Sequence, residues 1–181
     1  NDAVYGSDGS LYFTDPSYGL EGNEASPLRE LDFNGIFRLN PDGELQLLSR
    51  DQSRPNGIAL SPDETILYSA NSDPDAKMWM AYDLSPDGAS NARVFYDVTD
   101  QTTGGLPDGM KVDTQGNVFG TGPGGVWVFA PDGTHLGTIM PDEVPANVGW
   151  GDDGHTLYMT AQTGIYRIRL TASGQIPGPT S

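Results

Sequence analysis

Apolar and polar residues follow one another along this chain in a pattern that occurs four times. In the copy that spans 54–71, a polar residue is followed by a short apolar strand, a Pro/Asp turn and a second apolar strand. The polar residue stands ten positions before a closing apolar pair, or eleven where the turn holds one residue more. The four polar positions are Asn1, Asn56, Asp108 and Asn147. Because all copies keep the same register, they indicate an internal structural repeat.

Each repeat predicts further strands separated by short turns. Asp8-Gly9 is a strong signal for a tight hairpin, because both residues tolerate a positive φ. The expected outer strands of the four repeats are 35–39 with 44–48, 77–82 with 92–96, 126–129 with 135–139, and 164–170. A long loop rich in Gly, Pro, Ser and Glu is expected at 15–33. No window carries a 3.6-residue apolar period, so no α-helix is predicted.

Units of four short antiparallel strands, each about 40–50 residues long, are typical of β-propeller blades. We therefore expect an all-β fold, a partial propeller with its N-terminal part missing. Its blades are expected at about 1–50, 51–100, 101–141 and 142–181. If the first strand of each blade lines the central channel, the four polar positions gather at one mouth of that channel. The loops that begin at Asp15, Asn71, Gly120 and Gln162 lie on the same face.

Three carboxamides and one carboxylate at a channel mouth offer oxygen ligands of the kind that Ca²⁺ prefers. Neutral amide oxygens suit a site that holds an ion and leaves positions for water or substrate. The alternative is structural, because Asn and Asp often precede strands as turn formers. The residues that follow the polar position differ between copies and are Asp2, Gly57, Gly109 and Val148. A hairpin turn would have kept its glycine, so the common offset favours a binding ring.

Composition narrows the classes of function. The 181 residues include 25 acidic and 9 basic side chains, for a net charge of −16. Such a charge repels nucleic acid and anionic membranes and attracts cations, although solubility alone also explains an acidic surface. No apolar run reaches the roughly 18 residues needed to span a bilayer, and no signal peptide is recognised. The absence of cysteine excludes thiolate chemistry and leaves the compartment of this soluble protein, cytoplasmic or periplasmic, open.

Three local motifs that could indicate a function are better explained as parts of the fold. Residues 120–125 fit G-x-G-x-x-G, but they lead into a strand, so no helix N-terminus is available for a pyrophosphate. Residues 72–75 resemble the start of a calcium loop, yet Leu84 stands where that loop needs a glutamate. His135 and His155 follow turns on the face opposite the polar ring, and no G-x-S-x-G is present. Serine hydrolysis is therefore not expected.

Several motifs together resemble the senescence-marker-protein-30/gluconolactonase family of six-bladed calcium propellers. The motifs are D-P-S-Y-G-L at 15–20, R-P-N-G-I-A at 54–59 and L-P-D-G-M-K-V-D at 106–113. The resemblance covers nearly the whole chain and implies that about four of the six blades are present. It also implies a divalent metal on the channel axis, usually Ca²⁺, with Zn²⁺, Mg²⁺ or Mn²⁺ as alternatives. The family's N-terminal glutamate ligand has no counterpart here.

The resemblance also implies roles for single residues. Asn56 and Asp108 match two metal ligands, and Asn1 matches an asparagine that binds metal or substrate. The positions matched to the substrate, or to a loop that borders its pocket, are Asn147, Asp15 and Tyr18.

The implied reaction is metal-assisted hydrolysis of a small-molecule sugar lactone, such as gluconolactone, to the aldonic acid. The ion would polarise the carbonyl oxygen and stabilise the oxyanion. Asp108 is the candidate catalytic base, although a carboxylate bound to Ca²⁺ is a weak one. Two alternatives stay open: a propeller hydrolase that acts on organophosphates or aryl esters, and a non-catalytic propeller that binds a ligand or a protein. Nucleic acid and membranes are not expected partners.

Overall fold

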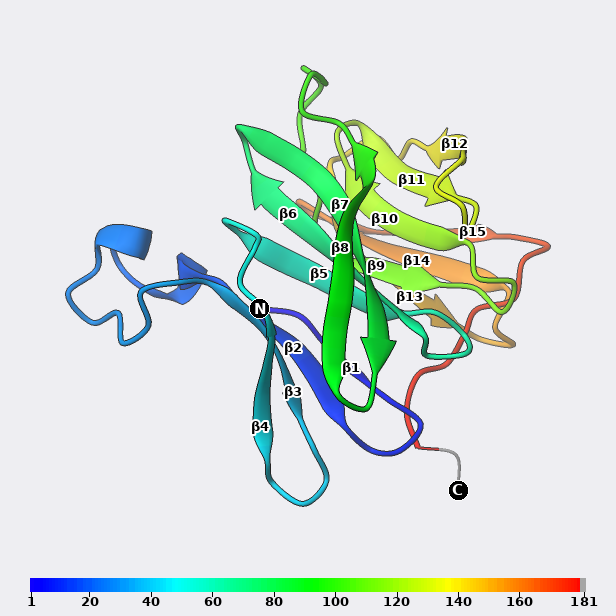
Figure 1. The fold of residues 1–181 in the computed structure, drawn as a ribbon. Coiled ribbons are helices and arrows are strands. Elements are labelled where there is room, and N and C mark those ends of the chain that lie inside the picture. Colours follow the sequence, from blue (N-terminus) through cyan, green and yellow to red (C-terminus); the bar gives the residue numbers. More distant parts are fainter. Residues whose placement is uncertain (180–181) are drawn as a thin grey trace.

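The computed structural model describes residues 1–179, which form fifteen strands and two short 3₁₀ helices (Figure 1). Three of the sheets have four antiparallel strands, and the fourth has three in this part of the chain. Within every sheet the strands neighbour one another in chain order. The prediction of an all-β propeller fold with antiparallel blades is therefore confirmed, as is the absence of α-helix from residues 1–179.

The strands have the following bounds. The first sheet contains β1 (Ala3–Tyr5), β2 (Leu11–Asp15), β3 (Gly35–Leu39) and β4 (Leu45–Ser49). The second sheet contains β5 (Pro55–Leu60), β6 (Ile66–Asp73), β7 (Ala76–Ser85) and β8 (Gly88–Asp97). The third sheet contains β9 (Met110–Val112), β10 (Val118–Gly122), β11 (Gly125–Phe129) and β12 (His135–Ile139). The fourth sheet contains β13 (Pro145–Gly151), β14 (Thr156–Ala161) and β15 (Ile165–Arg169).

Two details differ from the pattern-based expectation. The strands β7 and β8 extend well beyond 77–82 and 92–96. Most of β8 is exposed, so its polar residues give no apolar alternation from which its length could be predicted. The expected loop at 15–33 also contains η1 (Ser17–Gly19) and η2 (Asn23–Ala25), single turns too short to produce a helical period.

The inner strands β1, β5, β9 and β13 lie next to one another in this order, and Figure 1 shows the sheets fanned around them. Gly57 and Gly109 allow this close approach. A Cβ on Gly57 would lie 2.1 Å from the carbonyl oxygen of Asp108, and one on Gly109 would lie 2.1 Å from Cγ of Asn147. Glycine is thus required at position 57, where the neighbouring backbone occupies the space that a side chain needs, whereas a side chain at position 109 would displace the Asn147 amide.

Hydrophobic clusters fill the space between successive sheets. Trp79 and Phe129, which are fully buried, form the centre of the cluster between the second and third sheets, with ring centroids 4.9 Å apart. Trp150 packs edge-on against Phe119 at 5.0 Å between the third and fourth sheets. The tryptophans therefore pack in the core, as expected, and this packing makes the sheets a rigid support for the inner strands.

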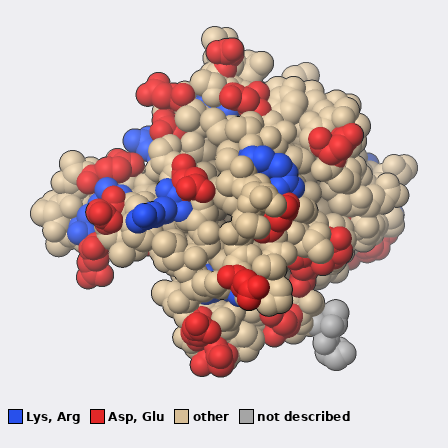
Figure 2. All heavy atoms as spheres, in the orientation of Figure 1, with Lys and Arg blue, Asp and Glu red and all other residues tan. Residues whose placement is uncertain are grey.

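Acidic side chains are scattered over the surface rather than gathered in one place, as Figure 2 shows for one face. Basic residues are interspersed among them. Neither of the short helices found within residues 1–179 has the length or the apolar character to cross a membrane.

Candidate active site at the channel mouth

Asn56 lies on β5 with only 5% of its surface exposed. Its Nδ2 donates to Ser72 Oγ at 2.7 Å, and its backbone carbonyl accepts from Thr14 Oγ1 at 2.6 Å. The side-chain oxygen Oδ1 is buried and has no hydrogen-bond partner in the part of the chain that the structure describes. An unsatisfied buried acceptor costs about 1–3 kcal/mol, so this oxygen is suited to receive a ligand from outside the chain.

Asp108 lies just before β9 and brings a second oxygen donor to the same place. Burial and, next, the charge of Asp2 raise the pKa of the Asp108 carboxyl to about 6. The Gly109 backbone amide and the Asn56 side chain lie close enough to lower it in part. The structure therefore brings Asn56 and Asp108 together, as the repeat predicts. No cation of the protein contributes to this pKa, so the carboxylate is placed where a bound cation would stabilise it.

Asp2 is a residue of this site that the sequence did not single out. Its Oδ1 accepts from Ala3 N at 2.9 Å and its Oδ2 accepts from Ile58 N at 3.3 Å, so the side chain bridges the first two inner strands. The available signal was an acidic residue directly after a repeat position, where two other copies have glycine. Because Asp2 lies close enough to raise the pKa of Asp108, the channel mouth contains two neighbouring acidic side chains.

The other two repeat positions lie in different environments. Asn147 is half-buried beside Gly109, and its Oδ1 accepts from Val148 N at 2.8 Å. Asn1 is exposed, and its backbone nitrogen donates to the Thr14 carbonyl. Asn56, Asp108 and Asn147 thus follow one another from one inner strand to the next around the mouth.

The loop after β2 brings Tyr18 toward Asp108. Burial raises the pKa of the Tyr18 phenol, the Ser72 hydroxyl and Arg54 lower it, and the charges of Asp108 and Glu24 raise it further. Glu24 and Arg54 form an ion pair at 3.2 Å that joins this loop to the residue before β5. Neither charge had been predicted to matter, because the pair joins segments far apart in the sequence.

Asp15 closes β2, is exposed, and pairs in the sheet with Gly35. It borders a hollow of about 350 Å³ whose other walls come from residues 16–34 of the same loop. Asp15 and Tyr18 thus both belong to the loop that the resemblance places at the pocket.

Hydroxyl groups on the second strand of three sheets tie each sheet to the next at the mouth. Thr14 Oγ1 donates to Asn56 O at 2.6 Å, Ser72 Oγ donates to Pro107 O, and Thr121 Oγ1 donates to Ala146 O at 3.1 Å. Each acceptor is a repeat position or the residue directly before one. These bonds fix the spacing of the polar ring, and the recurring hydroxyl residue near the end of the second strand is a signal that the sequence contains.

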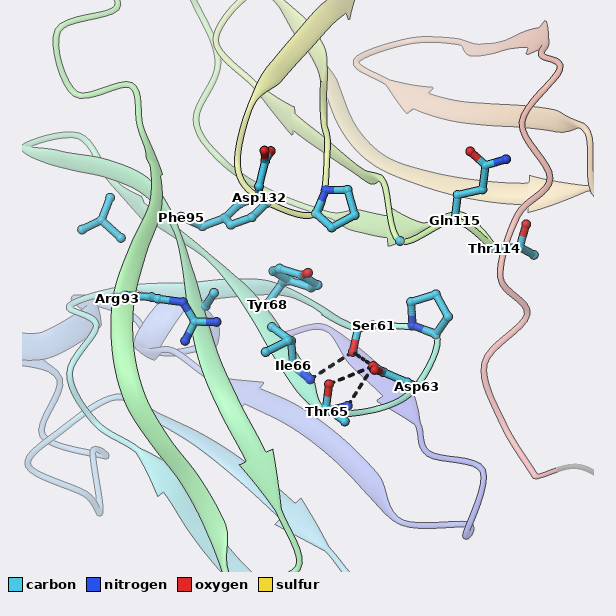
Figure 3. Close-up of a pocket in the computed structure, with 15 residues that line it drawn as sticks. Ser61, Asp63, Thr65, Ile66, Tyr68, Arg93, Phe95, Thr114, Gln115 and Asp132 are labelled. Carbon is cyan, nitrogen blue, oxygen red and sulfur yellow. Dashed lines mark hydrogen bonds between the residues drawn. The ribbon is translucent and has the colours of Figure 1, made fainter.

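A larger hollow, of about 650 Å³, opens on the opposite face between the second and third sheets (Figure 3). Its polar groups mostly serve the turn at 61–66, where Asp63 Oδ1 accepts from Ser61 Oγ at 2.6 Å and from Thr65 Oγ1 at 2.9 Å. Arg93, at its edge, pairs with Asp83 at 2.7 Å. Because these groups already have partners, this hollow is a weaker candidate for chemistry than the channel mouth.

Both histidines follow turns on that opposite face. The His135 ring packs against Trp127 at 4.5 Å, and His155 Nδ1 lies 2.8 Å from the Ala172 carbonyl oxygen. Within residues 1–179, no three side chains of His, Cys, Asp or Glu cluster in a way that could hold a metal. A metal at the mouth would therefore depend on amide as well as carboxylate oxygens.

Comparison with known proteins identifies the family. Residues 1–163 match the family described as the SMP-30/Gluconolactonase/LRE-like region, and the chain therefore belongs to it. It is 43% identical to the gluconolactonase of Zymomonas mobilis, across 96% of this chain and 51% of that protein. It is 34% identical to pentonolactonase XacC of Haloferax volcanii, across 71% of this chain and 45% of that protein. The resemblance found in the motifs is confirmed.

A solved structure supports the same assignment. The gluconolactonase of Xanthomonas campestris superposes with a TM-score of 0.81 at 30% identity, covering 97% of this chain and 56% of that one. The chain thus spans about half the length of the relatives that it matches.

Proposed function

We propose that the protein hydrolyses a sugar lactone, such as gluconolactone, with the help of a divalent cation held at the channel mouth. The observation that carries the proposal is the partnerless, buried Oδ1 of Asn56, on a side chain that lies close to the Asp108 carboxylate. The relatives described as a gluconolactonase and a pentonolactonase support the substrate class.

The donors at the mouth suit a hard cation. Asn56 Oδ1 and the Asp108 carboxylate would hold it, and Asn1 is the proposed third ligand. Ca²⁺ prefers such oxygen donors, while Zn²⁺, Mg²⁺ and Mn²⁺ are alternatives. A bound cation supplies Lewis acidity that polarises the lactone carbonyl and stabilises the negative charge formed on its oxygen. The acidic pair of Asp2 and Asp108 favours cation binding by simple charge attraction.

Asp108 is the proposed general base. A base works best when its pKa lies near the working pH. Burial raises the pKa of Asp108 to about 6 in the cation-free chain, and a bound cation would lower it again. The carboxylate takes a proton from water while the water oxygen bonds to the carbonyl carbon of the lactone. The bond from that carbon to the ring oxygen then breaks, and the ring oxygen takes the proton from Asp108 to become a hydroxyl of the aldonic acid, which returns Asp108 to its carboxylate form.

The remaining residues of the mouth are proposed to bind the sugar. Asn147 Oδ1 accepts from its neighbour Val148 N, and Nδ2 is the proposed donor to a sugar hydroxyl. The Tyr18 phenol is neutral near pH 7, since burial raises a pKa that already lies well above it, and it can donate as well as accept. Asp15, on the rim, accepts from hydroxyls. A polar lining of this kind suits a polyhydroxylated lactone better than an aryl ester.

Removal of the metal tests this proposal. With gluconolactone as substrate, we expect a chelator such as EDTA to lower acid release by the whole protein at least about 100-fold, and added Ca²⁺ to restore it. An aryl ester, assayed in parallel, is expected to be a poor substrate. Turnover that resists the chelator would contradict the role of the cation. Ca²⁺ binding without turnover of any lactone would instead favour a non-catalytic binding propeller.

A further inference from the structure

Ser72, near the end of β6, contacts one of the residues proposed to hold the cation, Asn56, and the residue directly before the other. Its Oγ accepts from Asn56 Nδ2 at 2.7 Å and donates to the carbonyl of Pro107, the residue directly before Asp108. We propose that Ser72 is a positioning residue that fixes the direction of the Asn56 amide, so that Oδ1 rather than Nδ2 faces the cation. This inference rests on the proposed function of the same site.

The direction of the amide follows from counting donors and acceptors. A serine hydroxyl has one proton to donate and two lone pairs with which to accept. The Pro107 carbonyl can only accept, whereas the nearby Tyr18 phenol can donate as well as accept, so the single Ser72 proton goes to Pro107. Ser72 Oγ can then only accept from Asn56, which requires the amide nitrogen to face Ser72. The two branches of an amide point apart, and Oδ1 is consequently turned away from Ser72.

Because Ser72 and Asn56 are both buried, the reversed orientation of the Asn56 amide is unfavourable. Ser72 is 4% exposed and Asn56 is 5% exposed, so water has little room to replace either group. With the amide reversed, Oδ1 would face the lone pairs of Ser72 and Nδ2 would present hydrogens to a cation. Both contacts are repulsive, and an unpaired buried polar group costs about 1–3 kcal/mol in addition.

The same hydroxyl couples two sheets. Asn56 belongs to the second sheet, whereas Pro107 leads into the inner strand of the third. The Ser72 hydroxyl therefore orients the Asn56 amide and at the same time holds the backbone directly before Asp108. Thr14 does not duplicate this role, because it holds the backbone carbonyl of Asn56 and not the side chain.

The matched test compares two serines of β6. In the metal-stripped whole protein, we expect Ser72→Ala to weaken Ca²⁺ binding, measured by titration calorimetry, about tenfold. Ser69→Ala is the control, since Ser69 is 0% exposed and its Oγ has no partner among the described residues. It is expected to leave Ca²⁺ binding unchanged. If Ser72→Ala does not fold, Ser72→Cys provides the same test, because a thiol of similar size is a weak hydrogen-bonding group.

A second substitution separates positioning from simple structural support. In an Asn56→Asp background both side-chain branches are oxygens, so orientation no longer matters and Ser72→Ala should cost less than about twofold in affinity. Equal losses in both backgrounds, or no loss in the wild-type background, would overturn the inference while leaving the proposed function intact. Wild-type protein that binds no Ca²⁺ would instead count against the proposed function itself.

Discussion

Replacement of Asp108 by asparagine is expected to lower the kcat for gluconolactone at least about 100-fold. The substitution keeps the size of the side chain but removes the negative charge and the basic oxygen. It thus weakens the hold on the cation and eliminates the group proposed to take the proton from water. Added Ca²⁺ at saturating concentration is expected to restore little of the loss, because the base remains absent.

Asp132→Asn is the control for this substitution. Asp132 is an exposed aspartate on the opposite face, where it accepts from Thr134 N at 2.9 Å within a turn. Steady-state kinetics with both variants separate a general effect of lost charge from a local one. An Asp108→Asn enzyme that keeps a kcat close to that of Asp132→Asn would show that Asp108 is not the base.

Replacement of Gly57 by alanine is expected to have the largest effect on stability, about 3 kcal/mol or more in the free energy of unfolding. The new Cβ would lie 2.1 Å from the Asp108 carbonyl oxygen and 2.9 Å from Cα of Gly109. These atoms belong to the backbone that leads into β9, the next inner strand, and this backbone cannot rotate away as a flexible side chain could. Overpacking commonly costs about 1–3 kcal/mol and more where the backbone must move. We also expect Asp108 to be displaced and Ca²⁺ binding to weaken.

Gly149→Ala provides the matched comparison. Gly149 also lies on an inner strand, β13, but a Cβ there would meet nothing within 4 Å. Its effect on the free energy of unfolding, measured by urea denaturation, is expected to be below about 1 kcal/mol. Similar losses for the two variants would show that the inner strands separate more easily than the close approach indicates.

The sequence was sufficient to predict the antiparallel sheets and the proximity of Asn56 and Asp108. Apolar strands repeated in a constant register predict similar sheets. If the first strand of each sheet lines the channel, as in a propeller, Asn56 and Asp108 are then predicted to approach each other. The structure places Asn147 on the next inner strand. The specific contributions of Asn1, Asn147, Asp15 and Tyr18 to binding stay predictions.

Contacts between sheets could not be predicted in the same way. The bridge that Asp2 makes to Ile58, the pair of Glu24 and Arg54, and the contact of Ser72 with Pro107 all join segments whose distance depends on the packing of whole blades. The alternation of apolar and polar residues predicts which face of a strand is buried, but it does not predict which residues of the neighbouring sheet that face contacts. The strict need for glycine at position 57 likewise depends on the neighbouring strand.

The raised pKa of Asp108 is typical of a functional site. A buried carboxyl beside a second acid is unfavourable for the folded chain alone, because the charged form loses hydration and is repelled by its neighbour. Such an arrangement is useful where a cation or a proton is to be bound.

The central claim, that Asn56 and Asp108 share one cation, is tested most directly by anomalous scattering from Ca²⁺-soaked crystals of the whole protein at long X-ray wavelength. We expect one strong peak at the channel mouth, roughly 2.3–2.6 Å from both Asn56 Oδ1 and an Asp108 carboxylate oxygen. A peak elsewhere, or an Asn56 Oδ1 that is hydrogen-bonded to the protein with no ion beside it, would contradict the claim.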